Sequence, residues 1–193
     1  KFAGASRKLG TQMKATGEVM SIAPSFEMAL MKAVRGAEIK LDTLNAPKLL
    51  DGVDLHEKLK DVDDIRLFTV FAALKAGISE DEIYEKTRID RWFINKLRHL
   101  AEFELDIEKN GLTDEKYLTG KKLGYTDEAL RRISGCEIKN PRRAVYKMVD
   151  TCAAEFKSYI PYLYSTYEDE NESIVTDRKK IVVLGSGPIR IGQ

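Results

Sequence analysis

The sequence AGISEDEI at residues 76–83 returns as LGYTDEAL at residues 123–130. Each copy holds a glycine, an apolar residue, a hydroxyl residue, acidic residues and then an aliphatic residue. A glycine suits the left-handed conformation that ends a helix. The hydroxyl can cap the next helix, whose first-turn carboxylates favour the positive end of the helix dipole. Each copy is therefore predicted to be a turn between two helices, with its final aliphatic residue facing the core.

The sequence around these two turns predicts a series of capped helices. Ser25 is expected to cap a helix that ends at Gly36, and Leu55 begins a short helix. The predicted caps of the later helices are Asp63, Ser79, Asp90, Thr113 and Thr126. Short helices joined by brief turns make a compact helical domain.

Apolar spacing selects the residues that these helices are expected to bury. The helix after Asp63 keeps one face apolar, and the long helix after Asp90 ends near Asn110. The predicted core residues of these two helices are Ile65, Phe68, Phe71, Ala72, Phe93, Leu97, Leu100 and Leu105.

Strand character is confined to segments near the ends of the chain. Residues 13–22 alternate imperfectly, residues 145–149 alternate, and the tyrosine-rich residues 159–167 favour an extended backbone. Residues 181–184 form an apolar run typical of a buried strand, and it leads into a glycine-rich turn at residues 185–192. The chain is therefore predicted to be mainly α, an all-helical bundle with helix-turn-helix-like repeats and short strand-containing ends.

Composition and charge limit the classes of function. The formal net charge is +1, so the chain has no electrostatic drive toward nucleic acid or an anionic membrane. No apolar run approaches the ~18 residues that a membrane helix needs. Cys136 and Cys152 are too few for a four-ligand metal site, and no secretory signal is visible, so a reduced, cytoplasmic location is expected.

The sequence predicts no catalytic, cofactor-binding or metal-binding residues. His56 and His99 are expected to be isolated on helical stretches, and neither cysteine has the His-Asp context of a nucleophile. A dinucleotide fingerprint in the glycine-rich turn would need glycine at position 190, where the chain has Arg190, and no Gly-Lys-Ser/Thr phosphate loop is present.

A helix-turn-helix pair also raises the alternative of a small regulatory protein that binds nucleic acid. Its recognition helix would present Arg91, Asn95 and Lys96 to the major groove. Trp92 and Phe93 have the character of packing anchors instead, and the charge balance is close to neutral. The hypothesis of protein contact is favoured, and the alternative stays open.

Several stretches closely resemble the large subunit of carbamoyl-phosphate synthase. Residues 149–156 read VDTCAAEF, residues 161–168 read PYLYSTYE, and residues 180–193 read KIVVLGSGPIRIGQ. At the front, KFAGA at residues 1–5 and QMKATGEVM at residues 12–20 agree as well. The matches follow the family order from end to end.

The resemblance implies a parent ligase of arginine and pyrimidine biosynthesis with two homologous ATP-grasp halves. The first half makes carboxyphosphate from bicarbonate and ATP, ammonia derived from glutamine converts this to carbamate, and the second half phosphorylates carbamate. By resemblance, residues 1–36 are the tail of the first half and residues 37–168 are a helical oligomerisation domain. Residues 169–178 are then a linker, and residues 179–193 are the first strand and glycine-rich turn of the second half. The strand-containing ends would thus belong to neighbouring α/β domains.

The resemblance also implies cofactors and partners. The parent is expected to use ATP, Mg²⁺ or Mn²⁺, and K⁺, and to bind a glutaminase small subunit. The family residues for these functions lie outside this chain, so the chain alone is expected to be inactive and to self-associate through its helical domain.

Site residues are carried over from the resemblance at a few positions. Glu18 matches a glutamate near the internal path that carries carbamate between the active sites. Gly185, Gly187 and Pro188 match the glycine-rich turn that borders the same path. The segment 136–144 is shorter than its counterpart in the family.

Overall fold

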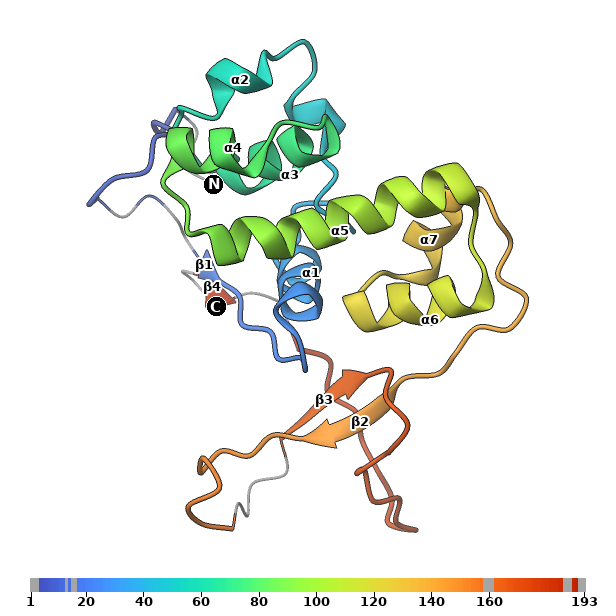
Figure 1. The fold of residues 1–193 in the computed structure, drawn as a ribbon. Helices are drawn as coiled ribbons and strands as arrows, with labels where there is room; N and C mark the ends of the chain where they lie inside the picture. Colours follow the sequence, from blue (N-terminus) through green and yellow to red (C-terminus); the bar gives the residue numbers. More distant parts are fainter. Residues whose placement is uncertain (1–3, 13, 15–16, 158–161, 186–188, 191–193) are drawn as a thin grey trace.

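The computed structural model describes residues 4–12, 14, 17–157, 162–185 and 189–190. Helices form most of the regular structure, which confirms the mainly α prediction (Figure 1). The α-helices are α1 (Phe26–Gly36), α2 (Leu55–Lys58), α3 (Arg66–Lys75), α4 (Glu80–Thr87), α5 (Arg91–Asn110), α6 (Asp114–Leu123) and α7 (Asp127–Ser134). A 3-10 helix, η1, covers Pro47–Leu49, and the strands are β1 (Gly17–Glu18), β2 (Val145–Met148), β3 (Leu163–Thr166) and β4 (Ile189–Arg190).

Helix α5 is the element around which the other helices pack. Its 20 residues carry an apolar stripe, and α1, α3, α4, α6 and α7 all contact it (Figure 1). Isolated helices gain little stability in water, so burial of this stripe is what stabilises α5. The largest fully buried side chains of the core are those of Met31, Leu44, Leu59, Val70, Phe71, Ile83, Ile94, Leu100, Ile107, Tyr125 and Leu130.

Both copies of the repeated sequence form the predicted turn. The side chains of Ser79 and Thr126 each accept a hydrogen bond from the backbone N–H three residues on, at the starts of α4 and α7. Gly77 and Gly124 have φ angles of +83° and +96°, in the left-handed region that follows a helix. The aliphatic residue that ends each copy is fully buried, as predicted.

Most of the other predicted caps are confirmed, and one is wrong. Ser25, Asp90 and Thr113 cap α1, α5 and α6 through their side chains. Asp63 does not cap α3, which begins at Arg66. The Asp63 carboxylate instead accepts bonds from the backbone N–H of Ile65 at 3.2 Å and from the Lys58 amine at 2.5 Å.

Two residues predicted for the core are exposed. Phe93 is 44% exposed and Leu105 is 40% exposed. Phe93 lies in the first turn of α5, beyond the helices that cover the middle of the stripe. Leu105 lies at the edge of the stripe, one position past the buried Glu104. Helical spacing identifies the stripe but not how far its neighbours extend over it.

Two short antiparallel strand pairs accompany the helices. Strand β2 pairs with β3, with Val145 opposite Thr166, which confirms the extended conformation predicted after residue 144 and in the tyrosine-rich stretch. Strand β1 pairs with β4, and among the described residues of the alternating stretch at 13–22 the strand consists of Gly17–Glu18. Residues 136–144 contain no helix or strand.

The strand predicted at residues 181–184 is wrong for this chain. Its four side chains are between 81% and 92% exposed, and none of these residues lies in a strand. A buried strand needs sheet neighbours on both sides, and no described segment pairs with this one.

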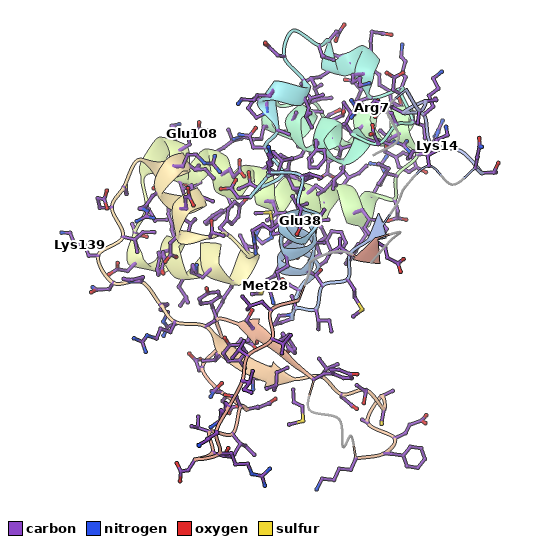
Figure 2. The ribbon with its side chains drawn as sticks, turned by 180° about the vertical axis from the view of Figure 1, so that it is seen from behind. Arg7, Lys14, Met28, Glu38, Glu108 and Lys139 are labelled. Atoms are coloured by element: carbon purple, nitrogen blue, oxygen red, sulfur yellow. The ribbon has the colours of Figure 1, made fainter. Side chains whose placement is uncertain are left out.

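Helix α1 lies between α5 and the β2–β3 pair (Figures 1 and 2). The Lys32 amine of α1 donates to the Ser165 carbonyl of β3 at 2.5 Å and lies 5.7 Å from the centre of the Tyr164 ring. The Arg35 guanidinium donates to the carbonyl of Gly124 at 2.7 Å. These bonds attach α1 to both the strand pair and the second turn.

The two turn glycines provide a matched test of this packing. A Cβ at Gly77 would meet no atom within 4 Å, whereas one at Gly124 would lie 3.0 Å from Met31 Cβ and 3.1 Å from Met28 Cα. We expect Gly77→Ala to lower the free energy of unfolding by about 1 kcal/mol through left-handed strain alone. Gly124→Ala should cost about 3 kcal/mol, because α1 must also move. Urea denaturation measures both, and equal losses would contradict the close packing of α1 on the second turn.

Candidate functional site

The structure brings the strand that carries Glu18 next to the end of the glycine-rich turn. In the β1–β4 pair, Glu18 lies opposite Ile189 and Gly17 lies opposite Arg190. Glu18 is exposed, and Gly185 is exposed with open space around its α-carbon. Gly187 and Pro188 lie outside the described residues. The two predicted groups of path residues thus come from segments that pair, and their role stays a prediction.

Three aromatic rings form a partly exposed cluster at the starts of α1 and α5. The rings of Phe26, Trp92 and Phe93 contact one another edge to face, with centroids 5.0–5.5 Å apart. Trp92 remains 51% exposed. We call these three residues the aromatic patch. Exposed apolar clusters commonly mark interaction sites.

Local sequence explains where the aromatic patch forms. The Ser25 cap places Phe26 at the first position of α1, and the Asp90 cap places Trp92 and Phe93 in the first turn of α5. The Lys96 amine lies one turn later, 5.4 Å from the centre of the Trp92 ring. Trp92 and Phe93 therefore act as contact residues, as their aromatic character predicted, although much of their surface is open to solvent.

A buried carboxylate lies directly beneath the patch. Glu27 is only 3% exposed, and its Oε1 lies 3.1 Å from His99 Nδ1 and 3.2 Å from Lys96 Nζ. Burial works to raise the pKa of Glu27, but the hydrogen bonds from His99 and Lys96 outweigh it and hold the pKa below its ordinary value. These contacts of Glu27 with His99 and Lys96 join α1 to α5.

The prediction that both histidines are isolated is wrong. His99 contacts Glu27, and His56 Nδ1 lies 2.6 Å from Glu82 Oε1. Each contact joins two helices that are far apart in sequence, so helical spacing within one segment could not reveal it. No catalytic base is assembled, because both partners are carboxylates without a neighbouring nucleophile.

A second buried carboxylate, that of Glu104, ties the second turn to α5. The Lys75 amine donates to Glu104 Oε2 at 3.0 Å, and the Tyr125 hydroxyl donates to Oε1 at 3.2 Å. Burial raises the pKa of Glu104, although Lys75 and Tyr125 oppose this, and burial also raises the pKa of the Tyr125 hydroxyl. Tyr125 occupies the apolar position of the second repeat, and nothing in the repeat predicts this bond.

The described residues offer no arrangement for metal chemistry. Across the ranges that the structure describes, no group of three or more His, Cys, Asp or Glu residues could hold a metal ion. Cys136 and Cys152 are free thiols. Among the described residues, no helix is long and apolar enough to cross a membrane.

The side chains that would read DNA are largely occupied within the chain. Arg91 pairs with Asp81 at 2.6 Å and lies 4.5 Å from the centre of the Tyr84 ring. Lys96 pairs with Glu27. A recognition helix needs its cations free to meet phosphates and bases, so this surface does not favour the nucleic-acid-binding alternative.

Comparison with known proteins gives one family. Residues 18–148 match the family described as carbamoyl-phosphate synthetase large chain, oligomerisation domain. The carbamoyl phosphate synthase large chain of Thermoanaerobacter sp. (strain X514) is 45% identical over 203 aligned residues. The alignment covers 100% of this chain and 19% of that relative, so the chain spans about a fifth of its length. The resemblance predicted from the sequence is confirmed, and neither match supports nucleic-acid binding.

The interaction of Glu27 with His99 and Lys96 should make the free energy of unfolding fall at acidic pH. Because its folded pKa lies below the ordinary value of 4.5, its contribution is complete above that value and is lost as the pH falls through the folded pKa. We expect Glu27→Gln to lower the free energy of unfolding by about 1 kcal/mol at neutral pH. The difference from the unmodified chain should shrink toward about pH 3.

Urea denaturation across this pH range measures the effect. Glu85→Gln is the matched control, because Glu85 is an exposed residue of α4 with no partner among the described residues. A difference for Glu27→Gln that stayed constant down to the lowest pH would show that the ion pair does not stabilise the fold.

Proposed function

The chain belongs to the carbamoyl-phosphate synthetase large-chain family, and we propose that it is the non-catalytic connector and self-association segment of such a large chain. The observation that carries the proposal is the match of residues 18–148 to the oligomerisation domain. A packed helical body around α5 gives this segment the rigidity that a spacer requires. The interior polar groups described above hold helices together and face no reacting ligand.

The chemistry is proposed to take place elsewhere in the parent. By family membership, the parent makes carbamoyl phosphate from bicarbonate, glutamine-derived ammonia and two ATP. ATP, Mg²⁺ or Mn²⁺, and K⁺ would be held by the two ATP-grasp halves, and a glutaminase subunit would supply ammonia. The described residues contain no group of three or more His, Cys, Asp or Glu that could hold a metal ion, and we expect the chain alone to hydrolyse no ATP.

The β1–β4 pair supports the role of connector. It joins β1, in the predicted tail of the first half, to β4, in the glycine-rich turn predicted near the start of the second half, although the helical domain separates them in sequence. Both halves would therefore leave the helical body at one place. The aromatic patch is partly exposed at the starts of α1 and α5, and we propose that the flanking halves cover it in the parent.

Self-association of the chain tests the proposal directly. Sedimentation velocity over a wide concentration range should show concentration-dependent assembly. The double variant Trp92→Asp/Phe93→Asp should assemble equally well, because the aromatic patch faces the flanking halves and not a second copy. A chain that stays monomeric at every concentration would overturn the self-association role. Salt-dependent binding to a DNA duplex would favour the alternative class.

Glu18 is proposed to form part of the polar wall of the carbamate path. Its carboxylate is exposed on β1, beside the segment that leads out of the glycine-rich turn. In the full enzyme, Glu18→Ala should reduce carbamoyl phosphate formation by about tenfold and bicarbonate-dependent ATP hydrolysis by less than about twofold. Of the two activities, only carbamoyl phosphate formation requires carbamate to move along the path.

Steady-state assays of both activities measure this split. Glu18→Gln keeps a polar side chain and should restore most of the overall rate. Glu85→Ala, at an exposed position of α4, should change neither activity. An equal loss of both activities in Glu18→Ala would point to a folding defect and count against the path role.

A further inference from the structure

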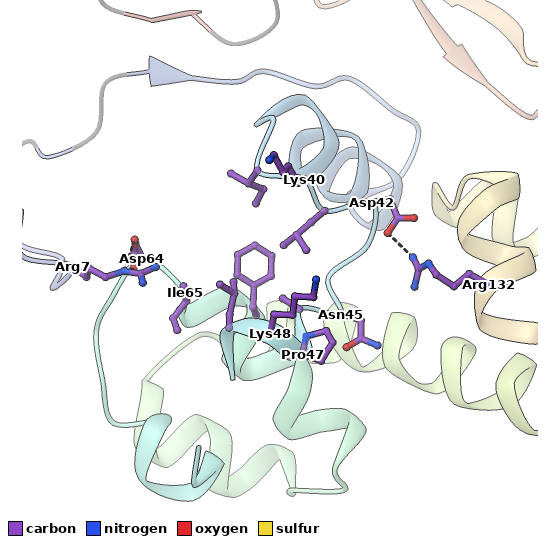
Figure 3. Close-up of a pocket in the computed structure, with 14 residues that line it drawn as sticks. Arg7, Lys40, Asp42, Asn45, Pro47, Lys48, Asp64, Ile65 and Arg132 are labelled. Carbon is purple, nitrogen blue, oxygen red and sulfur yellow. Dashed lines mark hydrogen bonds and ion pairs between the residues drawn. The ribbon is translucent and has the colours of Figure 1, made fainter. Parts of the chain in front are cut away.

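A cavity of about 640 Å³ lies between the segment after α1, the start of α3 and the helix α7 (Figure 3). It is separate from the aromatic patch and from Glu18, since none of those residues lines it. Its volume lies in the range of sites that hold small organic molecules, roughly 300–1,000 Å³. Neither the connector role nor self-association accounts for it.

The floor of the cavity is apolar. Phe68 and Ile65, at the start of α3, line this floor. Their side chains belong to the core, and only a small part of each is accessible from the cavity. Leu41 packs partly against the same core, and Ile39 and Leu49 form an apolar rim that is open to solvent. An occupant would therefore need an apolar body to replace water on this floor.

Some of the charged groups that line the cavity have ion-pair partners, and others do not. Arg7 Nε donates to Asp64 Oδ1 at 2.8 Å, and Arg132 Nη2 donates to Asp42 Oδ1 at 2.5 Å, so both lining carboxylates are already paired. Figure 3 shows these two pairs at opposite ends of the cavity. Each pair neutralises itself, and neither leaves a carboxylate free to attract a cation.

Two lysines remain without an acidic partner. Lys40 and Lys48 line the cavity from opposite sides (Figure 3), and neither forms an ion pair among the described residues. Lys40 has a left-handed backbone with φ of +62°. That conformation is uncommon for a residue other than glycine.

We propose that this cavity binds a small organic anion with an apolar body. The anionic group would lie between the Lys40 and Lys48 amines, where the charge of the lining is in excess, and the apolar body would cover Phe68. An ammonium ligand would meet like charge, and a sugar would leave the apolar floor without a partner. The proposal is independent of the connector role, because it requires only the folded chain.

A pair of fluorescent probes tests it. The probe 1-anilinonaphthalene-8-sulfonate has an aromatic body and one anionic group, and N-phenyl-1-naphthylamine is the same body without the sulfonate. The sulfonate probe should bind the chain with a saturable one-to-one fluorescence increase. The double variant Lys40→Gln/Lys48→Gln should weaken that binding by about tenfold and leave binding of the neutral probe within about twofold.

The matched control is Lys109→Gln/Lys122→Gln, since both lysines are exposed on helices away from the cavity. It removes the same charge and should leave sulfonate binding unchanged. Displacement by 1-naphthoate or by 1-naphthyl phosphate then decides whether carboxylates or phosphates are preferred. Equal weakening in both double variants, or no saturation, would overturn the proposal. So would sulfonate binding that disappears as the chain self-associates, because a second copy would then occupy the cavity.

Discussion

One buried carboxylate, that of Glu104, constrains the helical body more than any other single group. A charge in the interior is tolerated only when its partners are in place, and breaking such a pair typically costs about 3–5 kcal/mol. Its partners come from two separate elements, Lys75 at the end of α3 and Tyr125 in the second turn. Any shift of α3 or of the second turn along α5 would leave the carboxylate unsatisfied. The interaction therefore fixes the register of elements that apolar packing alone would allow to slide.

The two repeated turns show how one local sequence serves two tertiary purposes. Both place a glycine in the left-handed region and a hydroxyl at a helix cap, because backbone geometry and capping depend only on neighbouring residues. The first turn is open to solvent around Gly77, whereas α1 packs closely on Gly124. Tyr125 extends the second turn into the core. The repeat sets the turns, and the residue between glycine and hydroxyl decides how deeply each is buried.

This distinction explains how much the sequence could predict. Caps, helix ends and the apolar stripe of α5 follow from residues within one or two turns, and nearly all were correct. Two errors depend on distant segments: Phe93 lies past the helices that cover the middle of α5, and the run at 181–184 has no described sheet neighbour. The error at Asp63 is local, because its carboxylate bonds to Lys58 and to the N–H of Ile65 ahead of the helix start. The contact between Glu27 and His99 joins different helices, so the residue spacing within one helix could not predict it. Glu18 and its proposed neighbours came from family resemblance, since an exposed glutamate carries no local signal of its role.

The distribution of polar groups fits the proposed role of a body that transmits position. Inside, the carboxylates of Glu27 and Glu104 are held by cations on other helices, so each contributes to rigidity and neither is poised to exchange a proton with a ligand. Outside, the caps of α1 and α5 fix the position of the aromatic patch, so the proposed contact with the flanking halves would be made on a preformed surface. The cavity opens elsewhere, on the segment between α1 and α3. Because Phe68 and Ile65 belong to the same continuous core as α5 and Leu41 packs against it, an anion bound there would stabilise the helical body.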